Sequence, residues 1–185
     1  MNRHIPPLIE FFTNVSTNRS YPPSLRVMAL TFLMWCAMYK KSKLARHKLV
    51  SPLLCSILPI LAEDETVFDD DDTPPKLAFQ VISTLATNLS PNLVWPVVLE
   101  WVMKNIHGGQ WERKASMMAI GGCVDGCADT MRSNVNGLVE IVSHGLKDNE
   151  ESVRRAACYA LSCLAGKTDI SLFCAFYLFV FLTLT

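Results

Sequence analysis

The sequence predicts an all-α protein, an α-solenoid of antiparallel helix pairs. Residues 146–166 begin with an acidic, capping-rich stretch and continue with small apolar residues at helical spacing. This pattern predicts a helix that lies very close to a neighbouring helix. Similar stretches recur at residues 112–126, 76–89 and 24–39, about 40 residues apart, which is typical of two-helix repeats. The equivalent alanines are Ala156, Ala115, Ala78 and Ala29.

The stretch of residues 146–166 resembles the first helix of a HEAT repeat. Since 185 residues provide about four such pairs, we expect one HEAT-repeat array over residues 1–166 and a separate tail over residues 167–185. The residues that carry the resemblance are Leu146, Asp148, Val153, Arg154, Ala156, Ala157, Ala160, Leu161 and Leu164.

The formal net charge is zero, but the charges are unevenly distributed. Seven of the 17 acidic residues lie between residues 63 and 72, so the remaining chain carries 17 bases against 10 acids. Two opposed electrostatic fields are therefore expected. Seven cysteines, an odd number along apolar stripes, and no signal peptide predict reduced thiols in an intracellular protein.

Residues 4–16 are predicted to form a helix with an apolar stripe of Ile5, Leu8, Phe12 and Val15. Prolines at positions 6 and 7 suit its first turn. The HEAT resemblance implies that this is the second helix of a repeat whose first helix is absent.

The next predicted helix, residues 24–39, ends at a run of basic residues. This basic run has two interpretations, a nuclear-localisation patch and a solvated turn. We favour the turn, because positively charged side chains stabilise the C-terminal end of a helix. The helix presents Leu25, Met28, Phe32, Trp35 and Tyr39 on one side, and the basic residues are Lys40, Lys41, Lys43, Arg46 and Lys48.

A partner helix follows at residues 49–61, with Pro52 near its start and Pro59 late enough to bend it. The loop after it, residues 63–75, holds seven carboxylates and two prolines, and we expect it to be exposed and mobile.

The acidic loop has three interpretations. A divalent-cation site is disfavoured, because the loop lacks alternating ligands and a glycine turn. A solubilising insertion and a binding site for Lys- and Arg-rich proteins both remain open. The candidate cargo-binding residues are Glu63, Asp64, Glu65, Asp69, Asp70, Asp71 and Asp72.

Two further pairs complete the predicted array. Residues 76–89 pair with residues 91–106, where Trp95 is expected in the core rather than at an interface. Residues 110–129 pair with residues 135–146. The helix of residues 110–129 contains Gly121, Gly122 and Gly126. Glycine destabilises a helix relative to alanine, so three of them predict that a neighbouring helix packs very close at these positions. The stretch lacks the lysine and Ser/Thr of a phosphate loop.

The tail departs from the repeat pattern. Residues 170–184 are apolar at 13 of 15 positions, which is shorter than a membrane span. We expect an off-pattern end rather than a membrane anchor, because basic flanking residues are also missing.

Enzymatic and cofactor chemistry has little support. Cys123 and Cys127 form a local pair without a second metal-binding knuckle, which favours core cysteines over zinc ligands. No serine, cysteine or lysine has a histidine and an acid in motif spacing, so neither a catalytic residue nor a cofactor is predicted. Basic residues interleaved with aromatic ones are lacking, so direct nucleic-acid binding is not predicted.

The order of these features resembles the importin-β family, and in particular its importin four branch. The resemblance extends over residues 4–166. The stretches that carry it are SLRVMALTFLMWCAMYKKSKL, an acidic insertion ending TPPKLAFQVISTLATNL, WERKASMMAIGGCVDGCADTMR and GLKDNEESVRRAACYALSCLA.

This resemblance implies a nuclear transport receptor, present in cytoplasm and nucleus, that binds basic cargo such as ribosomal proteins or histones. It also implies binding of the Ran GTPase along the inner helices and of phenylalanine–glycine nucleoporins on the outer ones. Family members are several-fold longer, so a fragment is expected. A HEAT scaffold for a non-transport complex is the alternative, and an enzyme would require a converged polar pocket.

Overall fold

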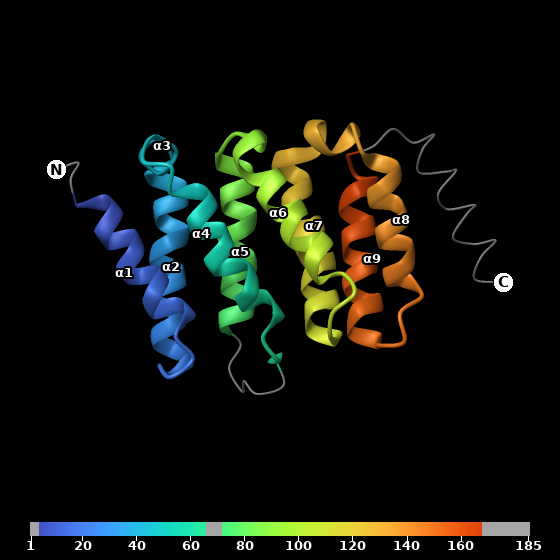
Figure 1. The fold of residues 1–185 in the computed structure, drawn as a ribbon, viewed down its shortest axis with the longest axis horizontal. Helices are drawn as coiled ribbons and strands as arrows, with labels where there is room; N and C mark the ends of the chain where they lie inside the picture. Colours follow the sequence, from blue (N-terminus) through green and yellow to red (C-terminus); the bar gives the residue numbers. More distant parts are fainter. Residues whose placement is uncertain (1–3, 66–71, 168–185) are drawn as a thin grey trace.

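The computed structural model describes residues 4–65 and 72–167, and within these ranges the regular elements are helices (Figure 1). The predicted fold class is confirmed. The elements are α1 (Ile5–Thr17), α2 (Pro23–Tyr39), α3 (Lys41–Arg46), α4 (Val50–Ile57), the 3₁₀ helix η1 (Leu58–Ala62), α5 (Pro74–Asn88), α6 (Pro91–Asn105), α7 (Gln110–Arg132), α8 (Val135–Leu146) and α9 (Glu151–Ala165).

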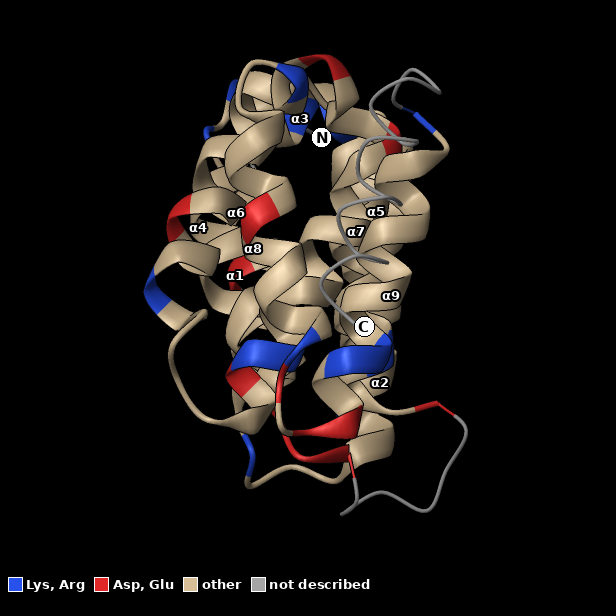
Figure 2. Ribbon diagram, turned by 90° about the vertical axis from the view of Figure 1, so that its right-hand side faces the viewer, with Lys and Arg blue, Asp and Glu red and all other residues tan. Residues whose placement is uncertain are grey.

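The helices form two layers, which Figure 2 shows on either side of the core. In one layer, here the A row, α2 packs on α5, α5 on α7 and α7 on α9. The second layer, the B row, holds α1, α4, α6 and α8, and each of its members contacts a helix of the A row. Helices 24–39, 76–89, 110–129 and 146–166 of the sequence prediction therefore occupy the A row.

The buried faces of the first two helices differ from the predicted stripes. In α1, Ile9 is buried and Leu8 is exposed. In α2, the core residues are Ala29, Leu30 and Leu33, whereas the predicted stripe lies at the surface. Trp35 is 58% exposed. Because α2 is apolar on nearly all sides, its periodicity does not identify the face that packs on α5.

The predicted helix 49–61 is two elements in the structure. Regular α-helix ends at Ile57, and η1 continues to Ala62 with Pro59 in its first turn. Proline has no N–H to donate to the carbonyl four residues earlier, so the chain tightens into a 3₁₀ turn there.

The acidic loop is shorter than predicted, because its two prolines belong to α5. Pro74 and Pro75 are buried in the first turn of that helix, where the missing N–H groups have no helical partner in any case. The Thr73 hydroxyl caps the helix by accepting a hydrogen bond from the Lys76 N–H at 3.4 Å.

The glycines of α7 mark close contacts with both neighbouring A-row helices. A Cβ atom at Gly126 would lie 2.0 Å from the Ala86 carbonyl oxygen of α5. A Cβ at Gly121 would lie 2.7 Å from the Tyr159 ring of α9, and one at Gly122 would lie 2.8 Å from the Phe79 ring of α5. The predicted close approach of helices at these glycines is confirmed.

The predicted tail, residues 167–185, lies outside the described residues except for Lys167. The boundary between array and tail therefore stays a prediction. Among the helices of the described ranges, none has the length and apolar character of a membrane span.

Candidate protein-binding surface

The acidic stretch begins with a residue that serves the fold. Glu63 is 7% exposed, and its carboxylate accepts two hydrogen bonds from Arg26, from Nη1 at 2.8 Å and from Nη2 at 2.6 Å. Arg26 Nε donates to the Ser16 carbonyl oxygen at 2.7 Å. Two charges buried together in this geometry satisfy each other, and they link α1, α2 and the end of η1.

This buried ion pair is not among the features predicted from the sequence. A signal was available, because Arg26 is the one charged residue of the predominantly apolar stretch of residues 23–39. A charge on such a helix requires a buried partner. The carboxylate of Glu63, one of the predicted cargo-binding acids, is instead paired with Arg26, and Arg19 Nε lies 3.3 Å from the same carboxylate.

Glu65 continues the acidic stretch and forms an ion pair with Lys114 of α7. The Lys114 ammonium also lies 5.2 Å from the centre of the Trp111 ring, within the range of a cation–π interaction. Lys114 therefore attaches the start of the acidic stretch to the N-terminal part of α7.

Of the other candidate acids, two lie within the described residues and three lie outside them. Asp72 is exposed just before the Thr73 cap, and Asp64 is half-buried. Asp69, Asp70 and Asp71 lie outside the described residues. Figure 2 shows acidic residues, in red, gathered at the lower edge of the molecule, where helices begin and end.

A groove lies between α7 and α9 beside Glu65, and we call it the α7–α9 groove. Its volume is about 750 Å³. Trp111, Met118 and Tyr159 provide apolar walls. The rim carries Lys114 of α7, and Glu151 and Arg155 of α9. The sequence analysis missed this groove, because its aromatic residues lie on two helices that are 41 residues apart in the repeat. The remaining lining residues include Glu65, Lys114, Glu150, Glu151 and Arg155.

A second ion pair fixes the turn before α9. Arg113 Nε and Nη2 donate to the Asp148 carboxylate at 2.7 and 2.9 Å. The Arg113 hydrogen bonds, assisted by the Glu150 N–H, hold the pKa of Asp148 below its usual range. Arg154 donates to the carbonyl oxygens of Asp148 and Asn149, both at 2.8 Å, so this turn is rigidly attached to α7 and α9.

Cys123 and Cys127 are buried in α7. Burial raises the pKa of both thiols, that of Cys127 to about 11, so both remain protonated and inert at neutral pH. The expected role as core cysteines agrees with this environment. Among the residues that the structure describes, no cluster of three or more metal-ligating side chains is found.

Comparison with known proteins supports the interpretation as a helical repeat. The HEAT-like repeat family matches residues 111–164. The structure of Kap121p bound to Pho4p superposes with a TM-score of 0.80 and 19% sequence identity, covering 90% of this chain and 18% of that protein. Other Kap121p structures with a similar fold contain RanGTP or Nup53p.

Two curated relatives are importins. The probable importin subunit beta-4 of Schizosaccharomyces pombe is 33% identical over 167 residues, which is 89% of this chain and 16% of the relative. Importin-4 of Mus musculus is 30% identical over 180 residues, covering 87% of this chain and 17% of the relative. The chain thus spans about a sixth of the length of these relatives, which are transport proteins and not enzymes.

The sequence similarity extends over nearly the whole chain, and the two-layer fold is similar to that of the matching part of Kap121p. The chain is therefore a homologue of importin-β family proteins, and it corresponds to a part of their HEAT-repeat array.

Proposed function

We propose that this chain is the part of a nuclear import receptor that contacts basic cargo, and that it operates between cytoplasm and nucleus. The observation that carries the proposal is its similarity to importins over 87–89% of its length. The family similarity suggests transport, and the acidic stretch suggests the kind of cargo, because clustered carboxylates attract Lys- and Arg-rich segments.

We further propose which of the acids contact cargo. Glu63 and Glu65 are ion-paired with Arg26 and Lys114, so their charges are largely compensated within the fold. The four consecutive aspartates at positions 69–72 are the densest negative charge in the sequence, and we assign them the main role. In this arrangement Glu63 and Glu65 anchor the start of the acidic stretch, and the aspartates supply its field.

The α7–α9 groove is a candidate for phenylalanine side chains of phenylalanine–glycine nucleoporins. Its walls of Trp111, Met118 and Tyr159 suit an aromatic ring, and its two helices belong to the row that the family resemblance assigns to the outside. Kap121p was crystallised with RanGTP, and we propose that the longer receptor containing this chain also binds Ran.

The test is binding of a fluorescent histone-tail peptide to the full chain at two salt concentrations. A variant with Asp69, Asp70, Asp71 and Asp72 changed to asparagine is expected to bind about tenfold more weakly at low salt. Wild-type binding should itself weaken as salt rises, because screening shortens the reach of the acidic field.

A matched control removes four exposed acids elsewhere, through Glu10→Gln, Glu100→Gln, Asp129→Asn and Glu140→Gln. It has the same net charge as the aspartate variant and should keep the wild-type affinity. Equal losses in both variants would show a non-specific charge effect. Absence of binding by the wild-type chain would instead favour the alternative of a HEAT scaffold for a non-transport complex.

A further inference from the structure

A group of positively charged side chains lies on α3 and on the residues next to it, and we call it the α3 cluster. It comprises Lys40, Lys41, Lys43, Arg46 and Lys48. Lys43 is half-buried and the other four are exposed. The blue ribbon of α3 in Figure 2 marks its position. The proposed cargo site does not use this cluster, because its charge has the sign of a basic cargo.

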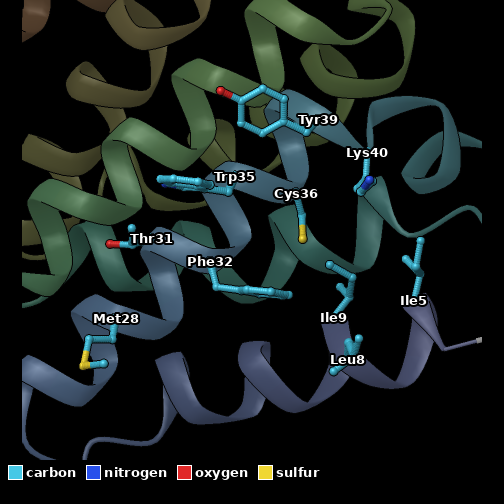
Figure 3. Close-up of a pocket in the computed structure, with 10 residues that line it drawn as sticks. All are labelled: Ile5, Leu8, Ile9, Met28, Thr31, Phe32, Trp35, Cys36, Tyr39 and Lys40. Carbon is cyan, nitrogen blue, oxygen red and sulfur yellow. The ribbon is translucent and has the colours of Figure 1, made fainter.

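Carboxylates of the fold do not neutralise the α3 cluster. The sequence has no acidic residue between Glu10 and Glu63, and Glu63 is paired with Arg26 and Arg19. In the described part of the chain, the ion pairs are all formed by other cations than these five. Towards α1, Lys40 borders an apolar pocket of about 720 Å³ whose described lining holds no carboxylate (Figure 3).

The helix ends beside the α3 cluster account for only a part of its charge. α2 ends at Tyr39 and α3 ends at Arg46. The C-terminus of a helix carries about half a negative elementary charge, so two ends compensate about one of the five positive charges and leave about four. Like charges that lie close together repel one another, so an anionic partner would relieve this repulsion.

The backbone that carries the α3 cluster is held in one conformation. Leu44 is fully buried and attaches α3 to the core. The Lys43 N–H donates to the Lys40 carbonyl oxygen at 2.8 Å, and the Leu49 N–H donates to the Leu44 carbonyl oxygen at 2.9 Å. Lys48 has a φ of 55°, in the left-handed region that favours glycine. A partner therefore meets cations whose backbone is already fixed, which lowers the entropy lost on binding.

The composition of the α3 cluster favours carboxylates as its ligands. Four of its five cations are lysines, whose ammonium groups are point charges, whereas bidentate recognition of phosphates favours arginine. Sites for single-stranded nucleic acid also hold aromatic rings on which bases stack, and residues 40–48 contain no Phe, Tyr or Trp. With six residues, α3 is about 9 Å long, which about three residues of an extended segment cover.

We propose that the α3 cluster binds an acidic protein segment that carries at least three neighbouring carboxylates. α4 and η1 run from the cluster to Glu63, so this site and the start of the acidic stretch lie at opposite edges of the stack (Figure 1). A basic cargo and an acidic partner therefore have separate sites on the chain. The proposal rests on the charge balance of the described residues and does not depend on cargo binding.

The test is binding of a fluorescein-labelled hexaglutamate peptide to the full chain, measured by anisotropy at low and at high salt. Lys41→Gln, Arg46→Gln and Lys48→Gln together remove three exposed cations, and this triple variant should bind about tenfold more weakly at low salt. Binding to the wild-type chain should weaken as salt rises. The triple variant should bind the histone-tail peptide at least as well as wild-type, which separates this site from the proposed cargo site.

A matched control removes three exposed cations elsewhere, through Lys104→Gln, Lys147→Gln and Arg155→Gln. It has the same net charge as the triple variant and should bind hexaglutamate as the wild-type chain does.

Lys48→Gly separates the charge of this side chain from its effect on the backbone. Glycine adopts a φ of 55° without a steric penalty, so urea unfolding should show no loss of stability. Hexaglutamate binding should nevertheless weaken about threefold at low salt, because one cation is lost. A merely structural role of Lys48 predicts unchanged affinity.

Three results would overturn the proposal. One is failure of hexaglutamate to bind the wild-type chain at low salt, and the second is an equal loss of affinity in the triple variant and the matched control. The third is tighter binding of a single-stranded oligothymidine with the same number of charges, lost in the triple variant, which would reassign the α3 cluster to nucleic acid.

Discussion

Arg26 and Glu63 show how single residues organise this fold. Both are nearly inaccessible to solvent, and they meet across 37 residues of sequence through two short hydrogen bonds. An apolar helix tolerates a buried guanidinium when its charge and its donors are satisfied, and the Ser16 carbonyl oxygen takes a further donor. The same chemistry recurs at Arg113 and Asp148, in the turn before α9.

At the residue scale we predict that Asp148→Asn makes stability less dependent on acid. Arg113 lowers the pKa of Asp148 in the folded state, so the carboxylate stabilises the fold above its unfolded pKa of about 3.9. That contribution is lost as pH falls through the folded pKa. Near pH 6 the substitution should lower the free energy of unfolding by about 2 kcal/mol.

Urea unfolding of both proteins at pH 6 and pH 3 measures this effect. The difference between wild-type and Asp148→Asn should shrink at pH 3, because this pH lies below the unfolded-state pKa of about 3.9 and the stabilising contribution of the carboxylate decreases there. A difference that is the same at both pH values would contradict the assigned role of the Arg113 pair.

At the element scale, α7 is the helix on which the A row depends. It packs on α5 through Gly122 and Gly126 and on α9 through Gly121. Three glycines weaken an isolated helix, since each costs about 1 kcal/mol relative to alanine. The close contacts on both sides offset this cost, because helix backbones that approach closely gain many dispersion contacts.

We predict that Gly126→Ala lowers the free energy of unfolding by about 3 kcal/mol. Its Cβ would lie 2.0 Å from the Ala86 backbone oxygen, which cannot move unless α5 and α7 separate. Gly137→Ala in α8 is the matched control, because the nearest atoms there belong to the Asn134 side chain. Thermal unfolding should show the control to be neutral or slightly stabilised, and comparable losses in both variants would refute the packing argument.

At the scale of the whole molecule, stability should vary along the array. Within the described part of the chain, α5 and α7 have A-row neighbours on both sides, whereas α1 contacts α2 and α4. Repeat proteins gain stability from interfaces between neighbours, so elements with fewer interfaces open more often.

We therefore expect amide hydrogen exchange to be slowest in α5 and α7 and at least about tenfold faster in α1. Mass spectrometry of peptides from each helix would measure this gradient. Uniform protection of all helices would show that the array unfolds as one cooperative unit.

Repeats with a spacing of about 40 residues, amphipathic periodicity and the positions of proline and glycine were sufficient to predict the solenoid and most of its helices. The basic run predicted to be a solvated turn is instead the short helix α3, and Pro74 and Pro75 begin α5 rather than end the acidic loop. The same information predicted the close approach at the α7 glycines, because a glycine inside a helix indicates either instability or contact. These features depend on residues that are close together in the chain, so they can be identified from the sequence alone.

The tertiary structure decided what depends on partners distant in the chain. The sequence could not show which side of the apolar helix α2 is buried, because its apolar residues surround the helix and only its packing on α5 selects a face. It also could not show that Glu63 belongs to the core rather than to the acidic surface. The residues next to Glu63 in the sequence would be the same whether its carboxylate were buried or exposed. Its role depends on Arg26, whose Nη2 lies 2.6 Å from the carboxylate in the folded chain.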